Sequence, residues 1–283
     1  MFSIYIMEEL KNMINELDVS DKSKKVYVSL LNRMGKHKFK FPMKTPERSD
    51  YIEEFLREFP KYSTKLDLLN LVIVLRNAKD LKTDKLKELR KTFQKNRIND
   101  NVETMNQKAK ELLTLEQFKQ KLNESYDKEQ YEKYIVNYLW SNYGTRSKDV
   151  DVEIVKSKKA MTDQQQNYLH LAKSGVTWFR NNYKTSKTYG KKQHLIKEEK
   201  FVNAVKELGL GNILSGGQIG NALRKLMIEN HNESDIFKLL IDHAYDNEDT
   251  ERINELSETR GTNITTIRNF YNLNADKQII REL

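Results

Sequence analysis

This chain of 283 residues is organised around the stretch Tyr138-Leu-Trp-Ser-Asn-Tyr-Gly-Thr-Arg-Ser-Lys-Asp-Val150. The stretch begins inside an aromatic and apolar segment, residues 131–143, whose pattern predicts a buried helix. We expect the helix to end at Gly144, because glycine most easily takes the left-handed conformation that caps a helix. Arg146 follows at once, and its planar fork of donors suits two oxygens of one phosphate. The sequence therefore predicts an arginine held at a fixed point, just before the alternating strand-like run Val150-Asp-Val-Glu-Ile-Val155.

Composition favours helices and a reducing compartment. The chain has only three Pro and ten Gly, so residues that break helices are scarce. It has no Cys, which excludes disulfides, thiolate metal sites and cysteine catalysis. We find neither an apolar run of membrane-spanning length nor a signal peptide. The expectation is an intracellular protein, of the cytoplasm or nucleus of a host or of a virus, that is not secreted and not in a membrane.

Charge is unevenly distributed along the chain. Residues 1–110 carry 24 Lys and Arg against 16 Asp and Glu, whereas residues 111–283 carry 26 against 25. Residues 173–200 hold 8 basic and 2 acidic side chains, and residues 229–258 hold 2 basic and 10 acidic ones. A basic first half and a basic hairpin favour a polyanion as partner. A solvated lysine-rich surface is the alternative.

The apolar pattern predicts two domains of a mainly α fold. Residues 1–100 are expected to form a bundle of four or five helices, the fifth running from Thr83 to Gln94. The polar stretch from Lys95 to Thr104 lacks an apolar face, and we place a linker at residues 101–111. Residues 112–283 are expected to be mostly helical, with a small antiparallel β-sheet.

Basic residues gather on two predicted loops. Lys36, Lys38 and Lys40 alternate with aromatic residues in the loop Lys36-His-Lys-Phe-Lys-Phe-Pro42. In the second domain we expect a helix over residues 162–173, and then two strands that flank a turn rich in Ser, Thr and Gly. That turn presents Lys184 and Lys187, and Lys191 and Lys192 follow it. We predict DNA-backbone contacts for Lys36, Lys38, Lys40, Lys191 and Lys192.

The histidines show no metal-ligand spacing, and no carboxylate cluster suits Mg²⁺. We therefore expect no metal and no other cofactor.

The order of these motifs resembles that of the tyrosine recombinases, the phage integrase family. Gly144, Arg146 and Asp149 match the first arginine motif of the family, Gly-x-Arg-x-x-Glu/Asp. Leu223-Arg224-Lys225 resembles the second arginine motif, with Asn221 where the family has His. The resemblance covers residues 112–275, and in the first domain Ser23-Lys-Lys-Val-Tyr27 matches a helix of the family.

The end of the chain carries the remaining motif. Arg260-Gly261-Thr262 stands where the family has Gly-His-Ser, and Tyr271 follows in the place of the nucleophilic tyrosine. The resemblance implies that Tyr271 attacks a DNA phosphate and forms a 3′-phosphotyrosyl link. Arg260 would supply a hydrogen bond and a positive charge in place of His, but it cannot act as a base because it stays protonated.

The resemblance assigns the other roles as follows. Arg146 and Arg224 would neutralise the phosphate, and a hairpin lysine would protonate the leaving 5′ oxygen, with Lys187 the preferred match and Lys184 the second. Lys238 lies closer to Tyr271 in the sequence and is the alternative to Arg224, although a lysine cannot make a bidentate contact. His243 is a further alternative site residue.

The function that the resemblance implies is DNA strand cleavage and rejoining, as in site-specific recombination or integration. Double-stranded DNA would be the partner, with self-association on DNA and a tetramer when two sites are paired. A type IB topoisomerase shares the chemistry and is an alternative. The missing motif histidines favour a third interpretation, a DNA-binding protein of this fold that no longer cuts.

Overall fold

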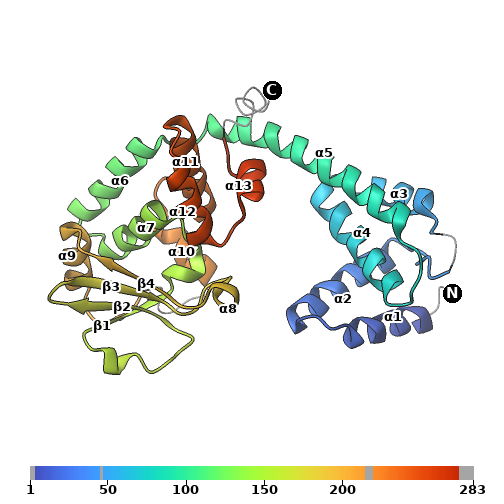
Figure 1. The fold of residues 1–283 in the computed structure, drawn as a ribbon, viewed down its shortest axis with the longest axis horizontal. Helices are drawn as coiled ribbons and strands as arrows, with labels where there is room; N and C mark the ends of the chain where they lie inside the picture. Colours follow the sequence, from blue (N-terminus) through green and yellow to red (C-terminus); the bar gives the residue numbers. More distant parts are fainter. Residues whose placement is uncertain (1–3, 45–46, 214–218, 274–283) are drawn as a thin grey trace. The chain divides into compact units, whose positions relative to one another are not determined.

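The computed structural model describes residues 4–44, 47–213 and 219–273, and the chain divides into two compact units, residues 1–101 and 102–283. Helices dominate both units, and the second unit also contains a five-stranded sheet (Figure 1). The predicted mainly α fold class is therefore confirmed. No helix in the described ranges combines the length and the apolarity that crossing a membrane requires.

The first unit is built from five helices in its described residues, the last of which it shares with the second unit. Its core is α4, whose Leu66, Leu68, Leu69, Leu71, Val72 and Leu75 are all buried. Ser20 caps α2 by accepting a hydrogen bond from the Ser23 N–H. The helices are α1 (Ile4–Glu16), α2 (Asp21–Lys36), α3 (Ser49–Arg57), α4 (Tyr62–Asn77) and α5 (Asp84–Ala109).

Helix α5 corrects one prediction. We expected a helix that ends at Gln94 and a linker after it, but α5 continues to Ala109 through the boundary between the units. Residues 95–109 contain neither Gly nor Pro, so nothing in them stops a helix that has already formed. The polar sequence was a poor sign of a linker, because an exposed helix needs no apolar face along its whole length.

The second unit is organised around α7 (Tyr131–Tyr143). This helix is buried on several sides, and it packs against α6, α9, α10, α11 and α12. It ends at Gly144, which has φ 61° and the left-handed cap conformation that the sequence predicts. The other helices are α6 (Leu115–Asp127), η1 (Ser147–Val150), η2 (Lys158–Ala160), α8 (Ser186–Tyr189), α9 (Glu199–Leu208), α10 (Ile219–Leu226), α11 (Glu233–Asp246), α12 (Thr250–Arg260) and α13 (Ile264–Phe270).

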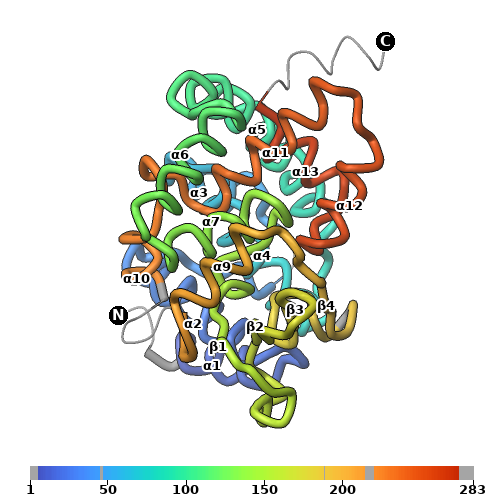
Figure 2. The backbone as a smooth tube through the Cα atoms, turned by 90° about the vertical axis from the view of Figure 1, so that its left-hand side faces the viewer, coloured from blue at the N-terminus to red at the C-terminus, as the bar shows by residue number. Residues whose placement is uncertain are grey.

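The sheet has the strand order β4-β3-β2-β1-β5. Strands β1 to β4 lie side by side in both views (Figure 2). One face, which includes Ile154, Leu169 and Trp178, belongs to the same hydrophobic core as α7. The strands are β1 (Val152–Val155), β2 (Asn167–Ala172), β3 (Gly175–Arg180), β4 (Lys192–Ile196) and β5 (Gly211–Asn212).

Two predictions about this sheet are wrong. The sheet is mixed and not antiparallel, because β1 and β2 pair in parallel. Residues 167–172, which we expected to be helical, form β2 between β1 and β3. The apolar spacing of this segment fits either structure, and the two neighbouring strands decide it by pairing with its backbone groups. The hairpin of β3 and β4 is confirmed as an antiparallel pair.

Candidate functional site

Arg146 lies in the turn between α7 and η1, and its side chain reaches the turn between α12 and α13. Its backbone N–H donates to Oδ2 of Asp149, 3.2 Å away. Its guanidinium donates from Nη2 to Oγ1 of Thr262 at 2.9 Å, and from Nη1 to the carbonyl oxygen of Arg260. The side chain is half-buried, and burial, followed by the nearby Arg260 cation, lowers the pKa of Arg146. This arginine is thus fixed by contacts to residues far away in the sequence.

Arg260 is the last residue of α12 and is only 2% exposed. Its Nη1 donates to the carbonyl oxygens of Gly144 and Thr145, both at 3.0 Å, and its Nη2 lies 3.4 Å from Oε1 of Glu233. Its hydrogen bonds therefore connect the end of α12 to the residues that follow α7. Burial is the main cause that raises the pKa of Glu233. The guanidinium of Arg260 stabilises the fold and does not face solvent.

Tyr271 follows α13 and is half-buried in the same cluster. Its ring meets the ring of Phe237 edge to face, with 4.9 Å between centroids. The guanidinium carbon of Arg260 lies 4.2 Å from the Phe237 centroid and 5.3 Å from the Tyr271 centroid. Arg146 reaches the same residue, because its Nη1 donates to the carbonyl oxygen of Arg260. The structure thus brings Arg146, Arg260 and Tyr271 together.

The connection between β3 and β4 packs against the turn that follows α12. Gly261 has φ 61°, and a Cβ placed on it would lie 2.2 Å from Oγ1 of Thr185. Lys192 donates to the carbonyl oxygen of Glu258 at 3.0 Å, and burial lowers its pKa. Lys184 and Lys187 are exposed on either side of Thr185 in the sequence. Both predicted hairpin lysines are therefore carried by a segment that touches the Arg260–Thr262 turn.

Arg224 is exposed on α10, a helix that packs against α7 and η1. Within the described ranges, Arg224 makes no hydrogen bond and no ion pair. Its neighbour Leu223 is buried in the core and fixes that side of the helix. Arg224 therefore does not meet Arg146 directly, but it is the predicted site arginine whose guanidinium is open to solvent.

Lys238 and His243 lie on α11, away from the cluster of Arg146, Arg260 and Tyr271 in the contacts that the described residues make. Lys238 is buried 3.5 Å from Oδ1 of Asp235, and Lys108 pairs with the same oxygen. Burial and the Lys108 cation lower the pKa of Lys238. Lys238 is therefore committed to a buried ion pair.

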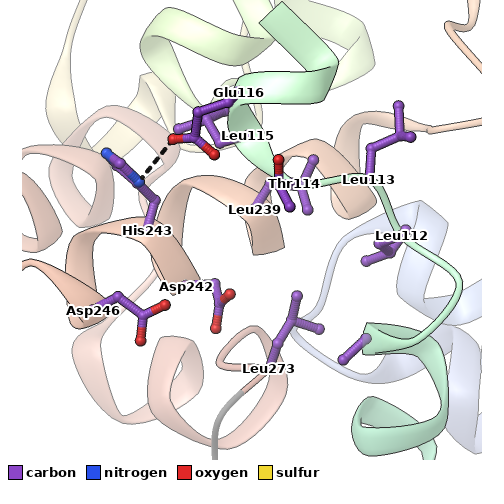
Figure 3. Close-up of a pocket in the computed structure, with 11 residues that line it drawn as sticks. Leu112, Leu113, Thr114, Leu115, Glu116, Leu239, Asp242, His243, Asp246 and Leu273 are labelled. Atoms are coloured by element: carbon purple, nitrogen blue, oxygen red, sulfur yellow. Dashed lines mark ion pairs between the residues drawn. The ribbon is translucent and has the colours of Figure 1, made fainter.

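His243 lines a pocket of about 390 Å³ (Figure 3). Its Nδ1 lies 3.5 Å from Oε1 of Glu116, and the dashed line in the figure marks this pair. Asp242 and Asp246 also line the pocket, together with leucines that include Leu239 and Leu273. The carboxylates of Glu116, Asp242 and Asp246 disfavour the binding of a phosphate in this pocket.

Sequence reasoning missed Arg180. It lies at the end of β3, is fully buried, and donates from Nη2 to Oδ2 of Asp149 at 2.7 Å and to the carbonyl oxygen of Thr259 at 2.9 Å. The available signal was its register: Arg180 shares the inward face of β3 with Val176 and Trp178. A charged residue on the core face of a strand requires a buried partner.

The five lysines predicted to contact DNA all lie on the surface or at its edge. Lys36, Lys38, Lys40 and Lys191 are exposed, and Lys192 is half-buried. Lys191 donates to Oε1 of Gln164. Among the described residues, no group of three or more His, Asp or Glu could hold a metal ion.

Comparisons with known proteins give little further guidance. No protein-family model matches the chain, and no curated protein sequence matches it. A comparison with solved structures finds a crystal structure of XerA recombinase, aligned over 98% of this chain and 98% of that one, with 12% sequence identity and a TM-score of 0.36. At that TM-score the likeness carries no inference about activity, which must rest on the residues described above.

Proposed function

We propose that this chain binds double-stranded DNA and cleaves and rejoins one strand through Tyr271. The observation that carries this proposal is that Arg146 and Tyr271 both lie against Arg260, at a turn where the connection bearing Lys184 and Lys187 also packs: Arg146 donates to the Arg260 carbonyl oxygen, and the Tyr271 ring centroid lies 5.3 Å from the Arg260 guanidinium carbon. These groups come from three separate parts of the sequence. A nucleophile, a phosphate ligand and candidate acids within one cluster are what a metal-free phosphoryl transfer requires.

The proposed reaction is a transesterification. The oxygen of Tyr271 gives its proton to solvent water and bonds to phosphorus. The bond from phosphorus to the 5′ oxygen breaks, and the leaving 5′ oxygen takes a proton from Lys187 or Lys184. Arg146 stabilises the non-bridging oxygens. Two of the five N–H donors of a guanidinium are used by Arg260 and Thr262, which leaves three for the phosphate.

Arg224 is the proposed second phosphate ligand. It is exposed and uncommitted among the described residues, and α10 packs on η1, the segment that follows Arg146. Arg260 has a different role in this proposal. Its acceptors hold it inside, where it fixes the turn and the ring of Tyr271 and does not touch DNA.

One face of α2 in the first unit supports DNA binding. Lys25, Ser29, Asn32, Arg33 and Lys36 are all exposed at helical spacing, and they line a surface hollow of about 550 Å³. Cations with short hydrogen-bonding side chains between them suit a helix that contacts phosphates and reaches base edges. This face is basic, and no acidic residue lines the hollow.

The loop after α2 adds exposed cations. Phe39 is buried against Phe55, with 4.2 Å between ring centroids, so this aromatic ring anchors the loop and does not stack on bases. The buried Arg76 donates to the carbonyl oxygens of Pro42 and Lys44, the latter at 3.1 Å. The loop is thus held from inside, while its lysines remain exposed.

A second candidate function is DNA binding without cleavage. This function is favoured because Arg260 and Arg180 are both buried. Of the three arginines Arg146, Arg180 and Arg260, Arg146 is the one that is partly exposed. A single half-buried arginine gives less charge stabilisation than the two that the reaction scheme uses.

A nicked suicide substrate separates these functions. Wild-type protein should form a covalent adduct that survives denaturation, Tyr271→Phe should bind DNA without forming it, and the matched control Tyr245→Phe on α11 should form it normally. Binding without any adduct supports the second candidate. An adduct of full yield from Tyr271→Phe moves the nucleophile elsewhere, and failure to bind duplex DNA at low salt overturns both functions.

Salt dependence tests the face of α2. Replacing Lys25 and Arg33 by Gln should lower affinity and reduce the slope of log K against log salt, by about 0.9 for each phosphate that is no longer neutralised. The control is Lys87→Gln, an exposed lysine on α5. Equal reductions of affinity in both variants would show a general charge effect and not a binding face.

A further inference from the structure

Arg180 joins three segments that carry the proposed site. It donates a hydrogen bond of 2.7 Å to Oδ2 of Asp149, which also accepts from the N–H of Arg146. It donates a second hydrogen bond, of 2.9 Å, to the carbonyl oxygen of Thr259, the residue before Arg260. Its guanidinium carbon also lies 4.7 Å from the ring centroid of Tyr183, at the start of the connection that bears the hairpin lysines. One fully buried side chain therefore contacts the segments that carry Arg146, Arg260 and the hairpin lysines.

The link from Arg180 to Arg146 runs through one oxygen atom. Oδ2 of Asp149 accepts both the Arg180 guanidinium and the backbone N–H of Arg146. Asp149 is 1% exposed, so without Arg180 it would be a buried carboxylate with no cation beside it. Bringing Asp149 to water would require the turn at Arg146 to move, and this would alter the contact that holds Arg146.

We infer that Arg180 is a positioning residue, which holds Arg146 in place through Asp149. The inference rests on the proposed function in assigning phosphate binding to Arg146. Arg180 itself does not touch DNA, because its side chain is fully enclosed by Trp178, Tyr183 and the end of α12. Two of its nitrogens, Nε and Nη1, have no hydrogen-bond partner in the described residues. A buried cation with unsatisfied donors is costly unless its charged partner stays fixed.

The competing interpretation is that the Arg180–Asp149 pair only stabilises the fold. The double variant Arg180→Met with Asp149→Asn separates the two, because it removes both buried charges and keeps at position 149 an oxygen that can accept from the Arg146 N–H. If the pair is only structural, stability and site geometry should return together. If Arg180 positions Arg146, stability should return while the turn at Arg146 is displaced, because the acceptor at position 149 is no longer held by Arg180.

The first measurement needs no DNA. The Nε–Hε resonance of Arg146, assigned by its loss in Arg146→Lys, reports the surroundings of that guanidinium. We expect it to shift or broaden in Arg180→Lys and in the double variant, since a lysine cannot hold both acceptors of Arg180. The same resonance should be unchanged in Arg76→Lys, in which another fully buried arginine of the chain is replaced.

The second measurement is the rate of adduct formation on the nicked substrate. At saturating DNA we expect the double variant to be slower by about 10–100-fold, since small displacements of a positioned group have effects of this size. Its DNA affinity should stay within about threefold, because the exposed cations are unchanged.

The outcomes are distinguishable. A folded double variant with an unchanged Arg146 resonance and a wild-type rate overturns the positioning role. A second outcome is that the Arg146 resonance shifts in the variants but the wild-type protein itself forms no adduct. This result supports the positioning role of Arg180 and overturns the proposed cleavage. Should the double variant fail to fold, Arg180→Lys is judged by the same two measurements.

Discussion

Gly261 is the contact point between the turn after α12 and the connection of β3 and β4, so alanine at this position tests how the site is assembled. The residue has φ 61°, in the left-handed region. A Cβ there would lie 2.2 Å from Oγ1 and 2.9 Å from Cγ2 of Thr185. Thr185 is branched at Cβ, so rotating its side chain exchanges one close atom for another.

The cost of Gly261→Ala has three parts. Left-handed backbone costs an alanine about 1–2 kcal/mol. Alanine has less conformational freedom than glycine in the unfolded chain, and this difference stabilises the folded state by about 0.4–1 kcal/mol. Overpacking against Thr185 costs about 1–3 kcal/mol. We therefore expect the free energy of unfolding to fall by about 1–5 kcal/mol in total.

Urea unfolding followed by tryptophan fluorescence is the assay. Both tryptophans, Trp140 and Trp178, belong to the second unit, so the signal reports the unit that contains Gly261. The cost of a left-handed alanine backbone is measured separately at Glu129, an exposed residue with φ 58°. It is the difference in unfolding free energy between Glu129→Gly and Glu129→Ala.

A second-site change isolates the packing part. Thr185→Gly removes the atoms that the new methyl group would meet, so the double variant should recover about 1–3 kcal/mol relative to the sum of the single variants. The reasoning is refuted if Gly261→Ala costs no more than the Glu129 difference, or if Thr185→Gly gives no recovery. Adduct formation should follow the same pattern, because the displaced connection carries Lys184 and Lys187.

Three further predictions concern the second unit, and the same fluorescence assay measures each. Burial, aided by nearby cations, lowers the pKa of His194 to about 4, so the unfolded state takes up more protons between that value and 6.5. Stability should be full above pH 6.5 and fall toward pH 4, by about 1–2 kcal/mol after allowance for partial exposure, and His194→Phe should remove this dependence. Gly144→Ala places a Cβ 2.8 Å from Leu256 in a residue with φ 61°. This change should lower the free energy of unfolding by about 2–4 kcal/mol. A cost equal to the backbone difference measured at Glu129 would contradict the packing argument. Lys238→Met should be neutral or stabilising, because Lys108 still pairs with Asp235, whereas Asp235→Ala should cost about 3–5 kcal/mol; equal effects of the two changes would contradict this.

Much of the local structure is encoded in short stretches of sequence. The left-handed cap at Gly144 is observed where the sequence predicts it. The hairpin of β3 and β4 was predicted for the same reason, since turn residues between two alternating runs act over few positions. These features depend on contacts between residues that are neighbours in the chain.

The predictions that failed depend on partners far away in the sequence. The apolar pattern of residues 167–172 fits both a helix and a strand, and pairing with β1 and β3 decides it. The polar stretch after Gln94 gave no sign that α5 would continue across the boundary between the units.

The arginines show the same division most clearly. The sequence singled out Arg146 from its place after a helix-ending glycine, and in the structure its guanidinium donates to Thr262 and to the carbonyl oxygen of Arg260. The sequence alone could not reveal that Arg260 would be enclosed by carbonyl oxygens of the segment after α7. Nor could it reveal that Arg180 would form the buried ion pair with Asp149. An arginine has the same donors in every setting, and its role is set by which acceptors the tertiary fold brings within hydrogen-bond distance.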